Sequence, residues 1–224
     1  DGILELIKPG YKKARRDYLK TLRQRNALLK RGPKNSSEMF PWNVRLSHLG
    51  GTLAAARHEL THNLNKDIGN TYKSLSSSKD KITLTYKSAV ELNAYESLLL
   101  KKLELDYELD LLRRFTAHGP HREDLEVLIN KKLPSNAASR GETRTITIAL
   151  KTLEHNLISE HAGRPPIILL DDVFSELDET RINQLASLIN ENQSIITSTS
   201  ISDKLRKLKH ANLIKTNQLT NTKT

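Results

Sequence analysis

The chain contains no cysteine, one tryptophan and one methionine among its 224 residues. The absence of cysteine excludes disulfide scaffolds, thiolate zinc sites and cysteine nucleophiles, and it is typical of proteins in a reducing compartment. Long hydrophobic runs are also absent, because the longest have four or five residues whereas a membrane-spanning helix needs about 20. No basic start precedes an apolar core of the kind found in signal peptides. We therefore expect a cytoplasmic protein with no membrane partner.

Acidic residues are scarce relative to basic ones. The chain has 36 Lys and Arg against 26 Asp and Glu, a formal net charge of +10. Residues 1–31 alone contain 10 basic and 3 acidic residues, so much of the excess lies at the start. Such a balance favours a polyanionic partner, of which nucleic acid is the most common. The length allows one large domain or two small ones.

Residues 11–29 are predicted to form a basic amphipathic helix. Tyr11, Tyr18, Leu22 and Leu29 fall on one face of a 3.6-residue repeat. The basic side chains around them are candidates for contacts to the phosphate backbone of DNA: Lys12, Lys13, Arg15, Arg16, Arg23 and Arg25. The alternative is that these charges only keep one face of the helix in water.

A second helix is predicted after the turn residues 31–37, with Pro41 near its first turn. Its apolar positions recur every three or four residues, which is typical of a helix packed against another: Leu46, Leu49, Leu53, Ala56, Leu60 and Leu64. The two helices are expected to form a hairpin. Residues 82–86 alternate apolar and polar side chains, which predicts a short half-buried strand.

Residues 89–115 fit two patterns. The alternation between Leu103 and Leu111 fits a strand, whereas another set fits one face of a helix: Tyr95, Leu98, Leu105, Leu109 and Leu112. The length of the segment favours the helix. Beyond residue 115, short apolar runs alternate with one clear helix, which is α/β character. We therefore predict a mostly α-helical basic arm over residues 1–112 and an α/β part over residues 113–224.

The strongest chemical signal lies at residues 166–172. Four aliphatic residues predict a strand buried on both faces of a parallel sheet, and Asp171 and Asp172 follow directly. Ligands of such sheets bind beyond the carboxyl ends of the strands. Adjacent strand residues point to opposite sides, so one carboxylate can order the water shell of Mg²⁺ while the other orients or deprotonates an attacking water. The alternative is a strand that simply ends in a polar turn.

Two further segments fit a phosphate site. Ser139 and Glu142 form a predicted capping box at the start of a helix, where free N–H donors and the helix dipole favour an anion. The alternative is that these residues merely start a helix. Residues 194–196 predict a strand ending in the hydroxyl residues Thr197, Ser198 and Thr199. If this strand neighbours the one that precedes the paired aspartates, its hydroxyls lie near the same phosphate and can sense it. The alternative is an ordinary strand that leads into a turn.

Residues 116–124 are dense in polar groups. His118 and His121 lie three residues apart across a Gly-Pro turn, and no third metal ligand is evident in the sequence. The segment is therefore predicted to be a structural turn that supports the α/β part.

Four blocks, in this order, resemble the bacterial RecF family: residues 22–30 (LRQRNALLK), 119–124 (GPHRED), 139–142 (SRGE) and 169–178 (LLDDVFSELD). Together they span most of the chain. Members of this family are DNA replication and repair ATPases whose heads resemble those of ABC transporters and SMC proteins. The resemblance implies an α/β fold, namely part of an ABC-ATPase-like (P-loop) head with an inserted α-helical arm.

The resemblance also implies a role for each matched residue. The signature motif, which contacts the γ-phosphate of ATP held by the opposite subunit, falls on Ser139, Arg140, Gly141 and Glu142. Asp171 matches the carboxylate near Mg²⁺, and Asp172 occupies the place of a catalytic glutamate. The D-loop along the dimer interface falls on Ser175, Glu176, Leu177 and Asp178. The switch position falls on Thr197, Ser198 and Thr199.

By the same resemblance we expect ATP and Mg²⁺ as cofactors and an ATP-dependent homodimer. Binding to gapped DNA or single-strand/double-strand junctions is expected to be independent of sequence. RecO and RecR are the implied partners in loading a recombinase during the response to DNA damage.

Two features depart from the family pattern. Asp172 is one methylene shorter than glutamate, which predicts slow ATP turnover. The phosphate-cradling loop G-x-x-x-x-G-K-[ST] does not occur in the sequence. Because the chain also begins at Asp1 without an initiator methionine, we expect a C-terminal portion that is inactive alone. The alternatives are a non-enzymatic basic DNA-binding or interaction module and the head of another SMC- or ABC-type ATPase.

Overall fold

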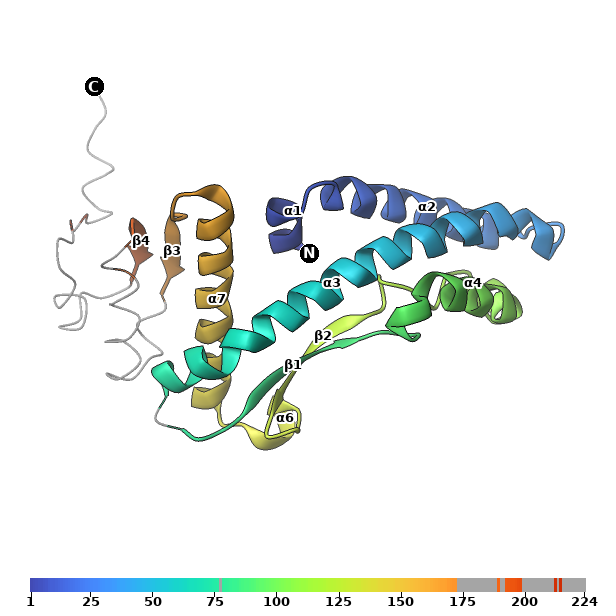
Figure 1. The fold of residues 1–224 in the computed structure, drawn as a ribbon. Helices are drawn as coiled ribbons and strands as arrows, with labels where there is room; N and C mark the ends of the chain where they lie inside the picture. The colour runs from blue at the N-terminus through green and yellow to red at the C-terminus, as the bar shows by residue number, and fades with distance from the viewer. Residues whose placement is uncertain (77, 173–188, 190–191, 199–211, 213, 215–224) are drawn as a thin grey trace, which may run out of the picture.

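The computed structural model describes residues 1–76, 78–172, 189, 192–198, 212 and 214. Its first part is helical: α1 (Gly2–Ile7), α2 (Tyr11–Arg31) and α3 (Phe40–Leu75), with a short 3₁₀ helix, η1 (Ser36–Met39), before α3. The long helices α2 and α3 lie side by side (Figure 1). The predicted helical hairpin is therefore confirmed.

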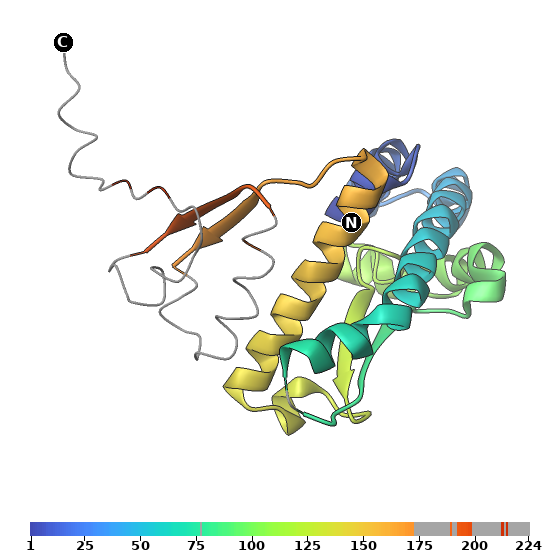
Figure 2. The same ribbon diagram turned by 60° about the vertical axis from the view of Figure 1, so that its left-hand side comes forward.

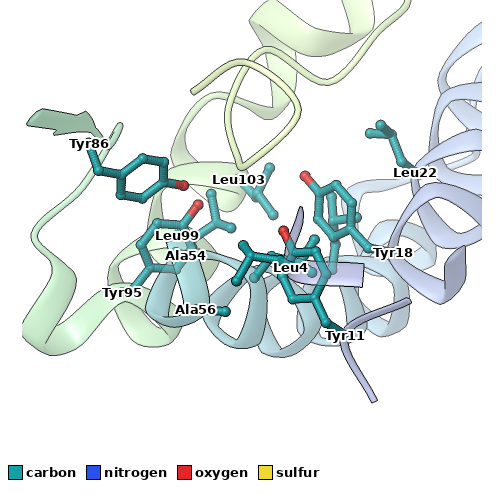
Figure 3. Packing of buried hydrophobic residues seen from close by; sticks show 12 residues of the cluster. Leu4, Tyr11, Tyr18, Leu22, Ala54, Ala56, Tyr86, Tyr95, Leu99 and Leu103 are labelled. Carbon is teal, nitrogen blue, oxygen red and sulfur yellow. The ribbon is translucent and has the colours of Figure 1, made fainter. Parts of the chain in front are cut away.

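The apolar stripes of both helices explain this packing. Tyr11, Tyr18, Leu22 and Leu29 of α2 are all buried, as the 3.6-residue repeat predicted. Gly32 follows α2 with a φ of 82°, a left-handed conformation that glycine adopts without steric cost. Further apolar residues complete the same core from α3, β1 (Ile82–Lys87) and α4 (Tyr95–Leu105), including Ala54, Tyr86, Tyr95, Leu99 and Leu103 (Figure 3).

The segment after β1 is helical, as its length favoured, but it is divided into separate helices. It begins with a short 3₁₀ turn, η2 (Leu92–Ala94), and bends at Asp106 between α4 (Tyr95–Leu105) and α5 (Tyr107–Arg113). Tyr95, Leu99 and Leu103 form its buried face against α3. Of the residues whose spacing fitted a helix, Tyr95 is buried, whereas Leu105, Leu109 and Leu112 are 72%, 48% and 81% exposed. That spacing therefore indicates the helix but not its buried face.

A two-stranded antiparallel sheet lies beneath α3. It pairs β1 (Ile82–Lys87) with β2 (Asp124–Ile129), so that Ile82 faces Ile129 and Lys87 faces Asp124. The strand predicted near residues 82–86 is confirmed. The hydrogen bonds of this sheet join residues 82–87 to residues 124–129, which lie on the two sides of position 113. The division of the chain into two domains at that position stays a prediction.

A second apolar cluster joins the far end of α3 to a later helix. After the single turn α6 (Pro134–Ala137), helix α7 (Arg140–Ala162) packs across α3 (Figure 1). Ile146 and Leu153 of α7 meet Ile68 and Tyr72 of α3 in this cluster. Helix α3 thus contributes to both hydrophobic clusters and connects them.

The last described elements are two parallel strands, β3 (Ile168–Asp171) and β4 (Ser194–Thr197). Both views place α7 between this pair and the hairpin of α2 and α3 (Figures 1 and 2). The parallel pairing agrees with the sequence prediction, but the burial does not. Leu169 is 71% exposed and Ile195 is 56% exposed, because only these two strands of the described chain form the sheet and one face stays open.

Among the described residues, no helix is both long and apolar enough to cross a membrane.

Candidate functional site

The paired aspartates lie at the carboxyl end of β3, beside the end of β4. In the parallel register Asp171 is opposite Thr197, which confirms that the two predicted strands are sheet neighbours. The Thr197 hydroxyl donates a hydrogen bond to Asp171 Oδ1. The Asp172 N–H lies 3.2 Å from both the carbonyl oxygen and Oγ1 of Thr197 and donates to them. The structure thus brings Asp171, Asp172 and Thr197 together.

Asp171 and Asp172 are both exposed, and they differ in backbone conformation. Asp171 is still in the strand, whereas Asp172 has a φ of 47°, in the left-handed region that aspartate tolerates better than most residues. Carboxylate and hydroxyl oxygens are the ligand type that Mg²⁺ prefers, and Mg²⁺ in nucleotide sites usually takes one or two carboxylates together with phosphates. The residues at this strand end therefore fit Mg²⁺.

Part of the expected site lies outside the described residues. Ser175, Glu176, Leu177 and Asp178, predicted to form the D-loop, belong to that part, and so does Thr199. Ser198 is described and exposed. Their roles stay predictions.

The helix start at Ser139 has the predicted capping box. Ser139 Oγ accepts a hydrogen bond of 3.3 Å from the Glu142 N–H, and Glu142 Oε2 accepts one of 2.6 Å from the Ser139 N–H. Ser139 and Arg140 are exposed, and Gly141 is half-buried. A 23-residue helix presents its first amide donors and its positive dipole end at this point. The capping box is confirmed, and the phosphate contact at this helix start stays a prediction.

A basic groove of about 660 Å³ lies along α1 and the first half of α2. Six cationic side chains line it: Lys8, Lys12, Lys13, Arg15, Arg16 and Arg23. His161, in the last turn of α7, also lines it. Five of the six predicted DNA-contacting residues therefore share one groove. Two of them have acidic partners: Arg15 pairs with Asp1 at 3.1 Å and with Glu5 at 2.7 Å, and Arg16 lies 3.9 Å from Asp17.

The sixth predicted residue, Arg25, does not belong to this surface. Its side chain is fully buried and pairs with Asp110 at 2.7 Å. It also donates hydrogen bonds to Asn43 Oδ1 at 2.8 Å and to Thr116 Oγ1 at 2.7 Å. Burial lowers the pKa of Arg25, and the hydrogen bond to Asp110 opposes that shift. A buried guanidinium with these partners cannot contact a DNA phosphate, so the prediction for Arg25 is wrong.

The segment 119–124 packs against the arm at Tyr18 of α2. His121 Nε2 lies 3.0 Å from the Thr116 carbonyl oxygen, which only accepts, so that nitrogen holds the proton and Nδ1 accepts from the Tyr18 hydroxyl at 2.7 Å. Burial lowers the pKa of His121. Gly119 has a φ of 124°, and a Cβ there would lie 2.6 Å from the Tyr18 hydroxyl oxygen. His118 pairs instead with Asp106 at 2.8 Å.

Glu123 joins β1, α4 and the loop after β1 to this segment. Its carboxylate accepts hydrogen bonds from the Tyr86 hydroxyl, from the Tyr95 hydroxyl at 2.8 Å and from the Ala89 N–H at 3.0 Å. The two tyrosine hydroxyls lie close together in Figure 3. The sequence predicted that this turn supports the α/β part, whereas the described contacts support the arm. Tyr18, Tyr86 and Tyr95 were placed in apolar patterns from the sequence but were missed as partners of this segment.

The chain is similar in sequence to bacterial RecF proteins. It is 36% identical over 190 residues to the DNA replication and repair protein RecF of Lachnoclostridium phytofermentans, a match that covers 84% of this chain and 52% of that protein. The RecF proteins of Ruminiclostridium cellulolyticum and Natranaerobius thermophilus are 32% and 34% identical and cover 89% and 91% of this chain. The chain spans a little over half the length of these relatives, 56% in the latter two. No protein-family model matches it.

A solved structure supports the same relationship. The recombination mediator protein RecF-ATPrS in the RecFOR pathway is 31% identical and superposes with a TM-score of 0.79, covering 91% of this chain and 57% of that one. RecF-ATP of the same pathway gives the same score over 90% of this chain. The expected fold class, a partial ABC-ATPase-like α/β head with a helical arm, is confirmed by this match. Over almost all of its length, the chain is a homologue of RecF.

Proposed function

We propose that this chain is part of an ATP-dependent DNA-binding protein of replication and recombinational repair. The observation that supports this most is the pair Asp171 and Asp172 at the end of a parallel strand, beside Thr197, in a chain that superposes on a RecF–ATP structure. Carboxylates at this position of a parallel sheet fit a Mg²⁺–nucleotide. ATP and Mg²⁺ are therefore the proposed cofactors.

The proposal assigns different tasks to the two aspartates. Asp171, fixed by the Thr197 hydroxyl, would hold Mg²⁺, which when bound neutralises charge on the nucleotide phosphates. Asp172 would orient the attacking water. Its short side chain reaches less far than glutamate would, which supports a slow ATPase that works as a switch.

Ser139 would contact the γ-phosphate of ATP held by a second copy. In the capping box Ser139 Oγ acts as an acceptor for the Glu142 N–H, so its own proton remains for donation to a phosphate oxygen. Gly141 permits close approach of the backbone, and the helix dipole adds to the attraction. ATP would thus join two copies, with the segment Ser175–Asp178 along their interface.

The basic groove would bind the DNA backbone. Lysine and arginine side chains line it, and contacts from such side chains to phosphates carry no sequence information. Gapped DNA and single-strand/double-strand junctions are the proposed substrates. RecO and RecR are the proposed partners, acting with this protein in the cytoplasm to load a recombinase during the SOS response to DNA damage.

The sheet formed by β3 and β4 has one exposed face. Parallel sheets are normally covered on both faces, yet Leu169 and Ile195 are largely exposed here. The relatives are almost twice as long as the part matched by this chain. We propose that the remaining part of the full-length protein covers this sheet and supplies the phosphate-cradling loop.

Ser139→Arg in the full-length protein tests the proposal. The bulky cation would fill the phosphate position on the opposite subunit, so we expect loss of ATP-dependent dimerisation in light scattering while ATP binding to the monomer stays nearly intact. Ser135→Arg, in the exposed turn before the same helix, is the matched control. Unchanged dimerisation of the Ser139 variant would contradict the proposal. This chain alone should show no ATP hydrolysis, because it lacks the phosphate-cradling loop.

A second candidate is a non-enzymatic basic DNA-binding module. The basic groove favours it, because six cationic side chains of this chain line it. DNA binding that is unaffected by ATP in the full-length protein would support this candidate over the first.

A further inference from the structure

The hydroxyl of Thr197 connects the two aspartates of the candidate ATP site. It donates to Asp171 Oδ1 and, at the same time, lies 3.2 Å from the Asp172 N–H, from which it accepts. A threonine hydroxyl has a single proton and two acceptor lone pairs, so both bonds can exist together. The carbonyl oxygen of Thr197 accepts from the same Asp172 N–H.

This use of the proton limits what else Thr197 can do. An ionised phosphate oxygen only accepts hydrogen bonds, and so does an ionised carboxylate. The one proton of Thr197 can therefore serve Asp171 or a nucleotide phosphate, but not both. In the structure it serves Asp171.

We propose that Thr197 is a positioning residue that fixes the Asp171 carboxylate and the backbone at Asp172, in place of the phosphate-sensing role predicted from its switch position. This inference rests on the proposed ATP site and deepens it. A carboxylate has two oxygens, so a bond at Oδ1 is compatible with a further ligand at Oδ2. The bond to the Asp172 N–H also holds the left-handed turn at that residue, whose φ is 47°.

The geometry explains why a threonine suits this position. Thr197 ends β4 directly opposite Asp171 in the parallel register, so its Cβ is held at a fixed place by the strand pairing. A β-branched side chain has few χ1 rotamers, which keeps the hydroxyl directed at the carboxylate. Partners that orient a metal-binding carboxylate typically change metal affinity 10–100-fold when they are removed.

The test compares three substitutions in the full-length protein: Thr197→Val, Thr197→Ser and Thr197→Ala. Valine keeps the shape of threonine without the hydroxyl, serine restores the hydroxyl, and alanine provides a second variant without it. Thr85→Val on β1, also an exposed strand threonine, is the matched control. Fluorescent ATP and ADP analogues are titrated with Mg²⁺ and, separately, with EDTA. Melting of each variant is followed by circular dichroism.

A positioning role predicts that valine and alanine reduce the enhancement of binding by Mg²⁺ about tenfold, equally for ATP and ADP. Affinity in EDTA should stay unchanged, and Thr197→Ser should recover the wild-type enhancement. A loss confined to ATP that persists in EDTA would overturn the inference in favour of phosphate sensing. An unchanged enhancement in the valine variant would also overturn it. Wild-type protein that binds neither nucleotide would instead refute the proposed function on which the inference rests.

Discussion

Replacing Arg25 by alanine is expected to destabilise the arm, because it leaves the Asp110 carboxylate buried without its cation. Both side chains are fully buried and their charged atoms lie 2.7 Å apart. Removing one partner of a buried ion pair costs about 3–5 kcal/mol. With a urea dependence of about 2 kcal/mol per molar, the unfolding midpoint of the arm should fall by about 2 M.

The only tryptophan of the 224 residues offers a local probe for this change. Trp42 is adjacent to Asn43, whose side chain accepts a hydrogen bond from Arg25, so its fluorescence reports on the affected region. The control is Arg23→Ala, two residues earlier on the exposed side of α2, which should stay within about 0.5 kcal/mol of the wild type.

A double substitution separates the ion pair from its other contacts. Arg25→Met with Asp110→Leu removes both charges and should recover part of the lost stability. Recovery should be incomplete, because the Ala117 N–H loses its acceptor on Asp110. An Arg25→Ala variant with unchanged stability but weakened DNA binding would refute this reasoning and restore the role predicted from the sequence.

Three further predictions concern the contact between segment 119–124 and the arm, and the basic groove. Gly119→Ala should lower the melting temperature, because its φ is 124° and the new Cβ would lie 2.6 Å from the Tyr18 hydroxyl oxygen, whereas Gly69→Ala, in open space on α3, should not. Burial lowers the pKa of His121 in the fold, so the unfolded chain binds more protons below about pH 6.5 and stability should fall with pH there; His121→Gln should flatten this part of the urea-unfolding profile. Lys13→Gln should reduce the slope of log K for DNA against log salt by about 0.9, measured by fluorescence anisotropy, and an unchanged slope would exclude Lys13 from the DNA contacts.

The helical arm was largely predictable from its sequence, because apolar periodicity directly reflects burial in helix pairs. The same periodicity contained the signal that was missed at Arg25. Tyr18, Leu22, Arg25 and Leu29 recur at intervals of four, three and four residues, so they share one face, and all four are buried. Assigning Arg25 by its charge, instead of its position on that face, led to the wrong prediction.

The buried face of α4 and α5 was not predictable in this way. Leucines occur on more than one face of this segment, so the pattern alone does not select the buried one. Packing against α3 selects Leu99 and Leu103, and Leu105, two residues after Leu103 on the same helix, points away from that face. Similarly, the aliphatic run before Asp171 indicated a parallel strand correctly, but its burial depends on neighbours that the local sequence does not specify.

Helix α7 connects the two parts of the proposed function. Its first residues follow Ser139, the proposed phosphate contact, and its last turn contains His161, which lines the basic groove. Between them, Ile146 and Leu153 pack on α3, so the 23 residues form one packed element about 34 Å long. A reorientation of α7 on engaging a phosphate would therefore move His161, the residue of α7 that lines the groove. If ATP changes the affinity for DNA in this way, DNA must change the affinity for ATP by the same factor, because coupling between two binding sites is reciprocal.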